Sequence, residues 1–267
     1  AYASVTTTNV VAWLNALAKE EQPPDEEQLK VLKAVAARCV SEAQEELSCM
    51  PKNTRSEPMT AAVLGIPGAG KSKCIKWIKR LFEERFGWEH GVHYQCLAPQ
   101  NTMAAAIGGN TVHSWAGVPI NATEAFEMGR RKKGVEDIDR LFLAAQSIRW
   151  ILIDEITGVS LGTLGTAESN IRRARQRSPF ARRADGSRRP WAGTNMLFFG
   201  DLWQLPPVRQ EAIFSNPFAK DLNHVEQRAA AFFWKRGPDS VQTLYELTQP
   251  HRFKRDPWMQ EILEEHR

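Results

Sequence analysis

The chain has 267 residues, 42% of them hydrophobic and 25% charged, and its formal net charge is +4. This length suits one large domain or two small ones of ordinary globular composition. No run approaches the roughly 18 apolar residues that a membrane span requires, so we expect no membrane partner. The first 21 residues have no basic region before their apolar part and no initial methionine. We therefore expect no signal peptide, and a chain excised from a longer protein.

Cysteine usage indicates a reducing, intracellular compartment. The four cysteines are scattered without a CxxC pair, at Cys39, Cys49, Cys74 and Cys96. This spacing argues against both a zinc site and a disulfide framework.

In chain order, the pattern begins with helices and then alternates strands with helices. We expect a short helix over residues 8–20 and, after the break QPPD, a long amphipathic helix from Glu26 to about Glu46. Five strands are expected later, the first followed by a glycine-rich turn and a helix over 71–86; they cover residues 60–65, 92–98, 149–154, 195–200 and 241–247. This alternation predicts an α/β fold, a mainly parallel sheet with helices on both faces.

The glycine-rich turn after the first strand reads GIPGAGKS and fits the pattern G-x-x-x-x-G-K-[ST]. Its candidate nucleotide-binding residues are Gly65, Pro67, Gly68, Ala69, Gly70, Lys71 and Ser72. Glycines let backbone N–H groups turn towards phosphate oxygens, and the helix N-terminus adds partial positive charge. Lys71 would reach the β- and γ-phosphates of ATP, and the Ser72 hydroxyl would ligate Mg²⁺. The alternative is a chance glycine-rich turn.

Two carboxylates, Asp154 and Glu155, end the strand that reads ILIDE. Ligands bind at the carboxyl ends of strands in an open α/β sheet, which is where these side chains would lie. Asp154 would hold Mg²⁺, mostly through water, and Glu155 would orient and deprotonate the attacking water. Alone, the pattern also fits an ordinary charged turn.

A glutamine stands in a stiff loop after another apolar strand, in the stretch GDLWQLPPV. Two prolines restrict this loop, so the side chain of Gln204 would be held still. Beside the phosphate loop, Gln204 would hydrogen-bond the γ-phosphate or its attacking water. The alternative is a plain turn at the end of a strand.

Gln28 allows two interpretations. Asp25 and Gln28 have the D-x-x-Q spacing of a helix capping box. An amide also offers a donor and an acceptor together, which suits the edge of adenine.

Two further segments are candidates for contact with nucleic acid. Residues 97–118 carry His113 and Trp115, which would bind phosphate and stack on a base, or else belong to the core. Residues 172–189 hold eight arginines and one aspartate. Such a stretch attracts phosphate backbones or is a solvated, partly disordered loop.

These motifs, in this order, resemble the PIF (petite integration frequency) family of DNA helicases, in the RecD-like branch of helicase superfamily 1. The matching text includes GIPGAGKS, AAAIGGNTVHSWAGV, ILIDEITGVS, FFGDLWQLPPV and LTQPHRF, and covers about residues 24–267. The resemblance implies a RecA-like P-loop NTPase that hydrolyses ATP with Mg²⁺ and moves 5′ to 3′ along single-stranded DNA. It places an N-terminal helical segment at 1–50 and the first of two motor domains at 51–267.

The resemblance also assigns roles to individual residues. Arg252 in PHRF would reach the γ-phosphate, and Gln28 would contact adenine. Single-stranded DNA, or a junction with double-stranded DNA, would lie against a loop whose contact residues are Pro99, Gln100, Asn101, His113 and Trp115. Related proteins act in DNA repair, recombination and telomere maintenance, in the nucleus or the mitochondrion.

The chain departs from the family pattern in several ways. Gln100 and Asn101 stand where Thr-Gly is usual, ITGVS stands where ISMVS is common, and the arginine-rich segment is longer and more basic than expected. We also expect that this sequence stops after the first motor domain and lacks the second RecA-like domain. Two other functions therefore remain open. One is a nucleotide-dependent DNA-binding switch or degenerate helicase remnant, such as that of a mobile element. The other is a basic interaction module in which ATP is only structural.

Overall fold

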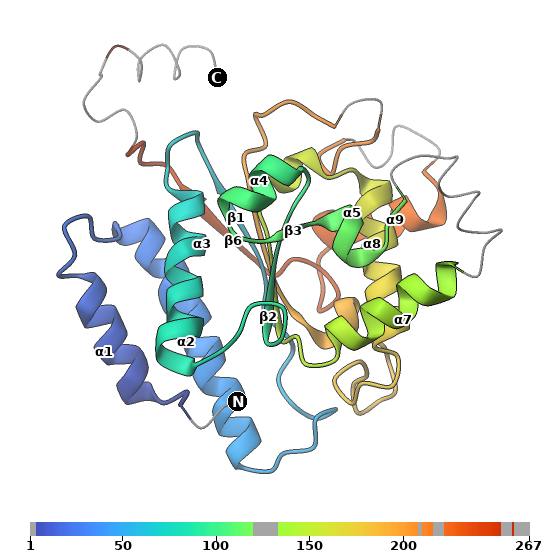
Figure 1. The fold of residues 1–267 in the computed structure, drawn as a ribbon, viewed down its shortest axis with the longest axis horizontal. Coiled ribbons are helices and arrows are strands. Elements are labelled where there is room, and N and C mark those ends of the chain that lie inside the picture. Colours follow the sequence, from blue (N-terminus) through green and yellow to red (C-terminus); the bar gives the residue numbers. More distant parts are fainter. Residues whose placement is uncertain (1–3, 120–132, 208–209, 216–221, 252–257, 259–267) are drawn as a thin grey trace.

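A single sheet of six parallel strands forms the centre of the computed structural model, in the order β3-β2-β4-β5-β1-β6 (Figure 1). The structure describes residues 4–119, 133–207, 210–215 and 222–251, together with Trp258. The strands are β1 (Thr60–Gly65), β2 (Tyr94–Ala98), β3 (Asn110–Thr111), β4 (Trp150–Ile153), β5 (Asn195–Gly200) and β6 (Thr243–Leu247).

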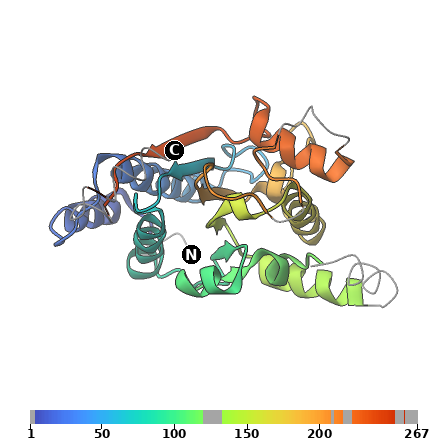
Figure 2. The ribbon, with the colours of Figure 1, turned by 90° about the horizontal axis from the view of Figure 1, so that it is seen from above.

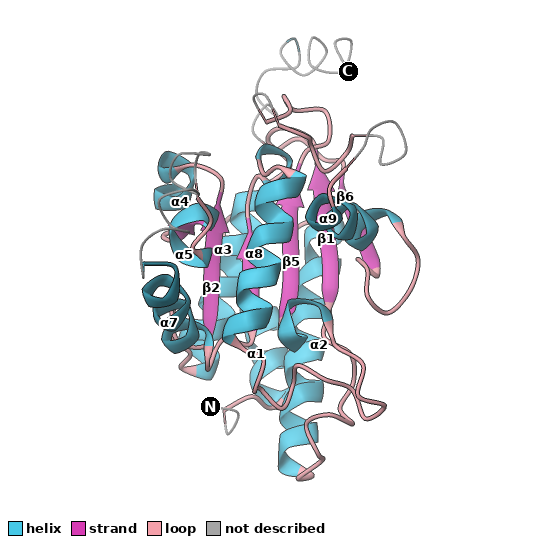
Figure 3. Ribbon diagram, turned by 90° about the vertical axis from the view of Figure 1, so that its right-hand side faces the viewer, coloured by secondary structure: helices cyan, strands magenta, loops and turns pink. Residues whose placement is uncertain are grey.

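Helices cover both faces of this sheet. One face packs against α1 (Thr7–Leu17), α2 (Glu26–Leu47), α3 (Lys71–Arg80) with its π-helical extension Leu81–Arg85, and α4 (Asn101–Ala106). The other packs against α5 (Val112–Ala116), α7 (Lys133–Ala145), α8 (Leu161–Ala174) and α9 (His224–Trp234). Short 3₁₀ turns lie at Ile156–Gly158 and Pro190–Gly193. Figure 3 shows the strands between these two layers, and Figure 2 shows β6 on the side opposite α4, α5 and α7.

The central strands read as continuous apolar runs because both of their faces are buried. All four residues of β4 and all six of β5 are buried, whereas the edge strand β6 exposes Leu244. Trp13 of α1 and Val35 of α2 belong to the same apolar cluster as Phe199 of β5. The helices before residue 50 therefore share a core with the sheet.

The predicted α/β fold is confirmed, and the five expected strands are present within one or two residues of their predicted ends. The two-residue strand β3 was not predicted. It is too short to show a periodic pattern. Gly109, just before it, allows a close approach to β2, since a Cβ there would collide with the Cys96 carbonyl.

The arginine-rich segment is partly structural, which neither of the two interpretations of its sequence included. Its first residues extend α8, and three of its arginines are structural. Arg175 and Arg189 are only 2% and 3% exposed, and Arg175 donates a hydrogen bond to the Thr194 hydroxyl. Arg183 pairs with Glu57 at 2.8 Å, and Arg189 pairs with the same carboxylate at 3.1 Å. These arginines brace the amino edge of the sheet rather than meeting solvent.

Within the described residues, no helix combines the length and the apolar character that crossing a bilayer requires.

Candidate nucleotide and DNA site

The phosphate loop lies between β1 and α3, as the sequence predicts. Gly68 and Gly70 have φ of 82° and 86°, a left-handed conformation that favours glycine. Gly70 precedes α3 and offers no side-chain cap, so N–H groups of the first helical turn remain available to an anion. Lys71 is largely buried, and its Nζ donates to the carbonyls of Gly65 (2.7 Å) and Ile66 (3.2 Å). The lysine therefore lies along the loop, beside the space that phosphates would occupy.

The carboxylates after β4 meet the phosphate loop. The Ser72 hydroxyl donates to Asp154 Oδ2 at 3.3 Å, and the Glu155 N–H donates to Asp154 Oδ1 at 3.0 Å. Burial raises the pKa of the Asp154 carboxyl, and these two hydrogen bonds offset only part of that effect. Ser72 and Asp154 thus place two hard oxygen ligands side by side, which suits Mg²⁺.

Glu155 has the backbone conformation of a strained residue. Its φ is 49°, which is rare for a residue with a long side chain and is often found at functional sites. Its Oε2 is buried without a hydrogen-bond partner in the described part of the chain. Burial, and then the charges of Asp154 and Asp201, raise the pKa of the Glu155 carboxyl, while Lys71 lowers it. A carboxylate held this way is suited to accept a proton.

Gln204 lies in a turn that starts beside this carboxylate cluster. Its N–H donates to the Asp201 carbonyl at 3.0 Å, and the Trp203 N–H donates to Asp201 Oδ1 at 3.1 Å. The side-chain amide of Gln204 has no hydrogen-bond partner among the described residues. A hollow of about 230 Å³ separates this turn from the phosphate loop and the end of β6; its lining includes Gly65, Ile66, Asp201, Trp203, Leu247 and Thr248.

Gln28 lies against the phosphate loop and also caps a helix. Its Oε1 accepts from the Asp25 N–H at 3.1 Å, and its N–H donates to Asp25 Oδ1 at 2.8 Å, which completes the capping box. Its Nε2 donates to the Ala69 carbonyl at 2.9 Å. The side chain is 1% exposed. The capping interpretation is therefore confirmed, and contact with adenine remains a proposal.

A second set of contacts, which the sequence did not predict, ties the end of β6 to this region. Thr248 donates to the Glu27 carboxylate through its N–H (2.6 Å) and its hydroxyl (2.7 Å). The His251 N–H donates to the Gly68 carbonyl at 2.9 Å. His251 Nε2 lies 2.5 Å from Asp25 Oδ2. Arg252, which follows His251, lies outside the described residues.

The expected DNA-contact residues follow the carboxyl ends of two neighbouring strands, β2 and β3. Gln100 and Asn101 are exposed at the start of α4, and Pro99 packs close to Gly158. His113 and Trp115 are half-buried on α5, and Trp115 packs against the core beneath α8. Their arrangement leaves the two amides available to a ligand, while the aromatic ring is partly committed to the core.

Comparisons with known proteins agree with this architecture. The sequence model of the family described as PIF1-like helicase matches residues 50–234. The chain is 28% identical over 147 residues to the ATP-dependent DNA helicase RRM3 of Saccharomyces cerevisiae, covering 55% of this chain and 18% of that protein. It is 25% identical over 199 residues to the ATP-dependent DNA helicase PIF1 of the same species, covering 74% and 20%.

Solved structures show the same fold. The Pif1 helicase of Candida albicans superposes with a TM-score of 0.60 at 22% identity, covering 91% of this chain and 43% of that one. The Bacteroides Pif1 helicase in complex with ADP-AlF3 and single-stranded DNA gives a TM-score of 0.50 at 22% identity, covering 90% and 45%. The chain thus spans less than half the length of each relative. With its phosphate loop and paired carboxylates at the carboxyl edge of a parallel sheet, the chain belongs to the PIF1-like helicase family.

Proposed function

We propose that this chain is the first motor domain of an ATP-dependent DNA helicase. It would bind and hydrolyse ATP and couple that turnover to 5′ to 3′ movement along single-stranded DNA. The observation that carries the proposal is Glu155 beside the Ser72–Asp154 pair at the phosphate loop, with a left-handed backbone and a buried Oε2 that has no hydrogen-bond partner among the described residues.

The chain's own groups divide the work of phosphoryl transfer. N–H groups of the phosphate loop and the start of α3 bind the phosphates, and Lys71 exchanges its carbonyl partners for phosphate oxygens. Ser72 and Asp154 would hold Mg²⁺, which neutralises phosphate charge when bound. No group of three or more metal-binding side chains occurs in the described residues, so substrate and water would supply the remaining ligands.

Glu155 accepts the proton of the attacking water, and Gln204 orients that water or contacts the γ-phosphate. Arg252 would add positive charge at the transferring group. Gln28 would contact the adenine edge through the second N–H of its side-chain amide, because the first N–H donates to the Ala69 carbonyl. These roles rest on the family pattern and on the positions of Glu155 and Gln28 described above.

DNA binding is proposed for the surface of Pro99, Gln100, Asn101, His113 and Trp115. This surface lies at the same edge of the sheet as the phosphate loop, which supports the assignment. Gly158, in the turn that follows Glu155, packs on Pro99. A conformational change caused by the bound nucleotide at Glu155 would be transmitted to the DNA surface through that contact. The solved relatives extend well beyond the matched region, which supports a second RecA-like domain as the partner that closes the site.

The test is steady-state ATP turnover and DNA affinity, with and without an oligo-dT strand, using Glu155→Gln as the control. We expect DNA affinity to change with the bound nucleotide, and any DNA-stimulated turnover to disappear in Glu155→Gln. Nucleotide-dependent DNA affinity with no turnover, even with the second domain joined, would favour the switch function. Steeply salt-dependent DNA binding that ignores nucleotide would favour the basic module.

A further inference from the structure

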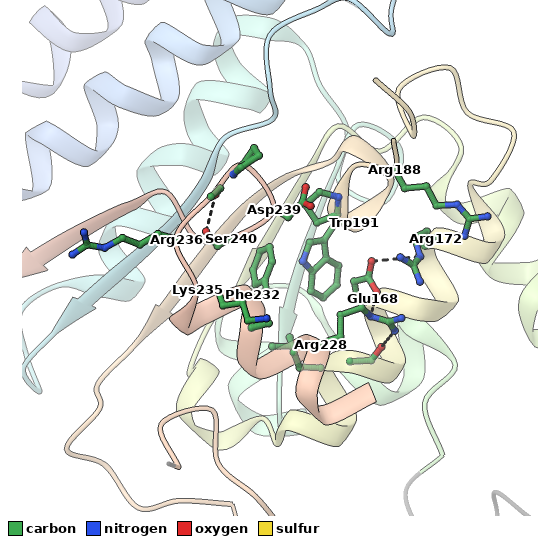
Figure 4. A pocket seen from close by; sticks show the side chains of 17 residues that line it. Glu168, Arg172, Arg188, Trp191, Arg228, Phe232, Lys235, Arg236, Asp239 and Ser240 are labelled. Carbon is green, nitrogen blue, oxygen red and sulfur yellow. Dashed lines mark hydrogen bonds and ion pairs between the residues drawn. The ribbon is translucent and has the colours of Figure 1, made fainter. Parts of the chain in front are cut away.

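An apolar pocket lies at the amino edge of the sheet, away from the phosphate loop. Its volume is about 390 Å³, within the range of ligand pockets, and α8, α9 and the segments that lead into β5 and β6 form its walls (Figure 4). Ser240, on its rim, accepts a hydrogen bond from Thr60, the first residue of β1. The phosphate loop follows the last residue of β1, so the length of that strand, about 20 Å, separates the two sites.

The floor of this pocket is apolar and built with unusual backbone geometry. Trp191 and Phe232 lie at its centre and are buried, with Leu164 beside them. Trp191 and Ala192 both have φ of 51°, two successive residues with side chains in the left-handed region. Such a conformation costs free energy and persists where the surroundings require it. Here it seats the indole ring beneath the opening.

The rim of the pocket is basic. Glu168 forms ion pairs with two arginines, Arg172 at 3.7 Å and Arg228 at 3.1 Å. Asp239 forms an ion pair at 2.7 Å with Arg183, a residue outside the pocket. Both rim carboxylates are therefore neutralised.

Three of the cations that line the pocket, Arg188, Lys235 and Arg236, have no such partner among the described residues. The side chains of Arg188 and Lys235 are exposed and form no hydrogen bond or ion pair with another described residue. Figure 4 shows them on opposite sides of the pocket, while Arg236 extends away from it. An apolar floor between two cations that pair with no other described residue suits a ligand with an apolar centre and negative charge on both sides.

A second basic hollow continues from this rim. Its volume is about 230 Å³, and it shares Arg172 and Arg188 with the first pocket, while Arg173 and Arg182 complete its basic lining. A negatively charged chain that leaves the pocket past Arg188 therefore meets further arginines.

We propose that this pocket docks an acidic peptide segment of a partner protein. One large apolar side chain of the peptide enters above Trp191 and Phe232, and acidic residues on either side pair with Arg188 and Lys235. An apolar anchor in a desolvated pocket with a charged rim is the usual arrangement of a peptide hot spot. The longer acidic run lies on the Arg188 side, along the second hollow.

Nucleic acid fits this pocket less well than a peptide does. Apart from its cations the lining is mainly apolar, which suits an apolar side chain better than it suits the phosphates of a nucleic acid backbone. The site also lies at the opposite edge of the sheet from the proposed DNA surface. A peptide bound here leaves the nucleotide and DNA sites free, so the motor can be tethered while it works.

The experiment uses this chain and a fluorescein-labelled peptide, Glu-Asp-Glu-Trp-Glu-Asp, followed by fluorescence anisotropy. We expect saturable binding that weakens with salt, and that weakens roughly tenfold or more when Ala replaces Trp in the peptide. The double variant Arg188→Glu, Lys235→Glu should lose binding by a similar factor. The matched control is Arg177→Glu, Lys33→Glu, which makes the same charge change at two exposed cations outside the pocket.

A cavity-filling variant tests the anchor without changing charge. Ala231→Trp places a large side chain in the pocket and should block the peptide, while the thermal unfolding midpoint reports whether the variant is folded. The proposal is overturned if the peptide fails to bind the unaltered chain, or if the control variant weakens binding as much as the rim variant. It is also overturned if an oligo-dT strand displaces the peptide at lower concentration than unlabelled peptide does.

Discussion

His251 Nε2 lies 2.5 Å from Asp25 Oδ2, so the segment after the last strand is tied to the start of α2, 226 positions earlier. Asp25 also caps that helix, and the His251 N–H holds the Gly68 carbonyl of the phosphate loop. These contacts make the two residues positioning groups for the nucleotide site.

We expect Asp25→Asn and His251→Gln each to weaken binding of a fluorescent ATP analogue by roughly three- to tenfold. Because the two side chains are in contact, the double variant should be less impaired than the product of the single effects, with a coupling energy of about 1 kcal/mol. The exposed His224, at the start of α9, provides the control His224→Gln. Independent, multiplicative effects would show that the pair does not act as a unit.

Gly70 is required for its backbone angle and for its closeness to Gln28. Its φ is 86°, and a Cβ at this position would collide with Gln28 Nε2. Gly70→Ala should lower the free energy of unfolding by about 1–3 kcal/mol and weaken nucleotide binding.

Gly87→Ala is the matched control for Gly70. Gly87 also has a positive φ, 64°, but a Cβ there would meet nothing within 4 Å. That variant should lose only the stability that a side chain costs at a positive φ, and it should bind nucleotide as the unaltered chain does. Equal nucleotide affinities for the two variants would contradict the proposed contact between Gln28 and the loop.

The strain at Glu155 predicts a conflict between stability and activity. Glu155→Gly should raise the free energy of unfolding by about 1 kcal/mol, since glycine accepts the left-handed conformation. The change also removes a buried oxygen, Oε2, that has no hydrogen-bond partner among the described residues. Glu155→Ala removes the same charge but keeps the strain, so it should be less stable than Glu155→Gly. Urea unfolding compares the two variants, and equal stabilities would show that the backbone is not strained.

The arginine-rich segment should divide into structural and surface residues. Arg189→Ala removes a buried partner of Glu57 and should cost about 2–3 kcal/mol. Arg177→Ala, at an exposed position, should change stability by less than about 0.5 kcal/mol. Thermal unfolding measures both. A similar midpoint for both variants would mean that the Arg189 contacts do not stabilise the fold.

The sequence predicts the features that depend on local pattern. β1, β4 and β5 are apolar runs of ordinary strand length, and the phosphate loop is a pattern of fixed spacing, so their positions follow from short stretches of sequence. Asp154 and Glu155 were placed beside the loop because the ends of parallel strands meet at one edge.

Features that depend on distant pairings could not be predicted in this way. The contact between Asp25 and His251, and the pairing of Glu57 with Arg183 and Arg189, join residues that only the complete fold brings together. Eight arginines in 18 residues look like a solvated patch, because Glu57, which pairs with Arg183 and Arg189, lies more than a hundred positions earlier. The capping role of Gln28 was predictable from spacing, but its bond to Ala69 was not.

Equilibrium titration with a fluorescent ATP analogue in the presence of Mg²⁺ shows whether the loop Gly65–Ser72 binds ATP. Lys71→Ala should weaken binding roughly 10- to 100-fold, since it removes a charged partner of the phosphates. Lys76→Ala, at an exposed lysine of the same helix, should bind as the unaltered chain does. Unchanged affinity in Lys71→Ala, or no binding by the unaltered chain, would show that this loop is not an ATP site.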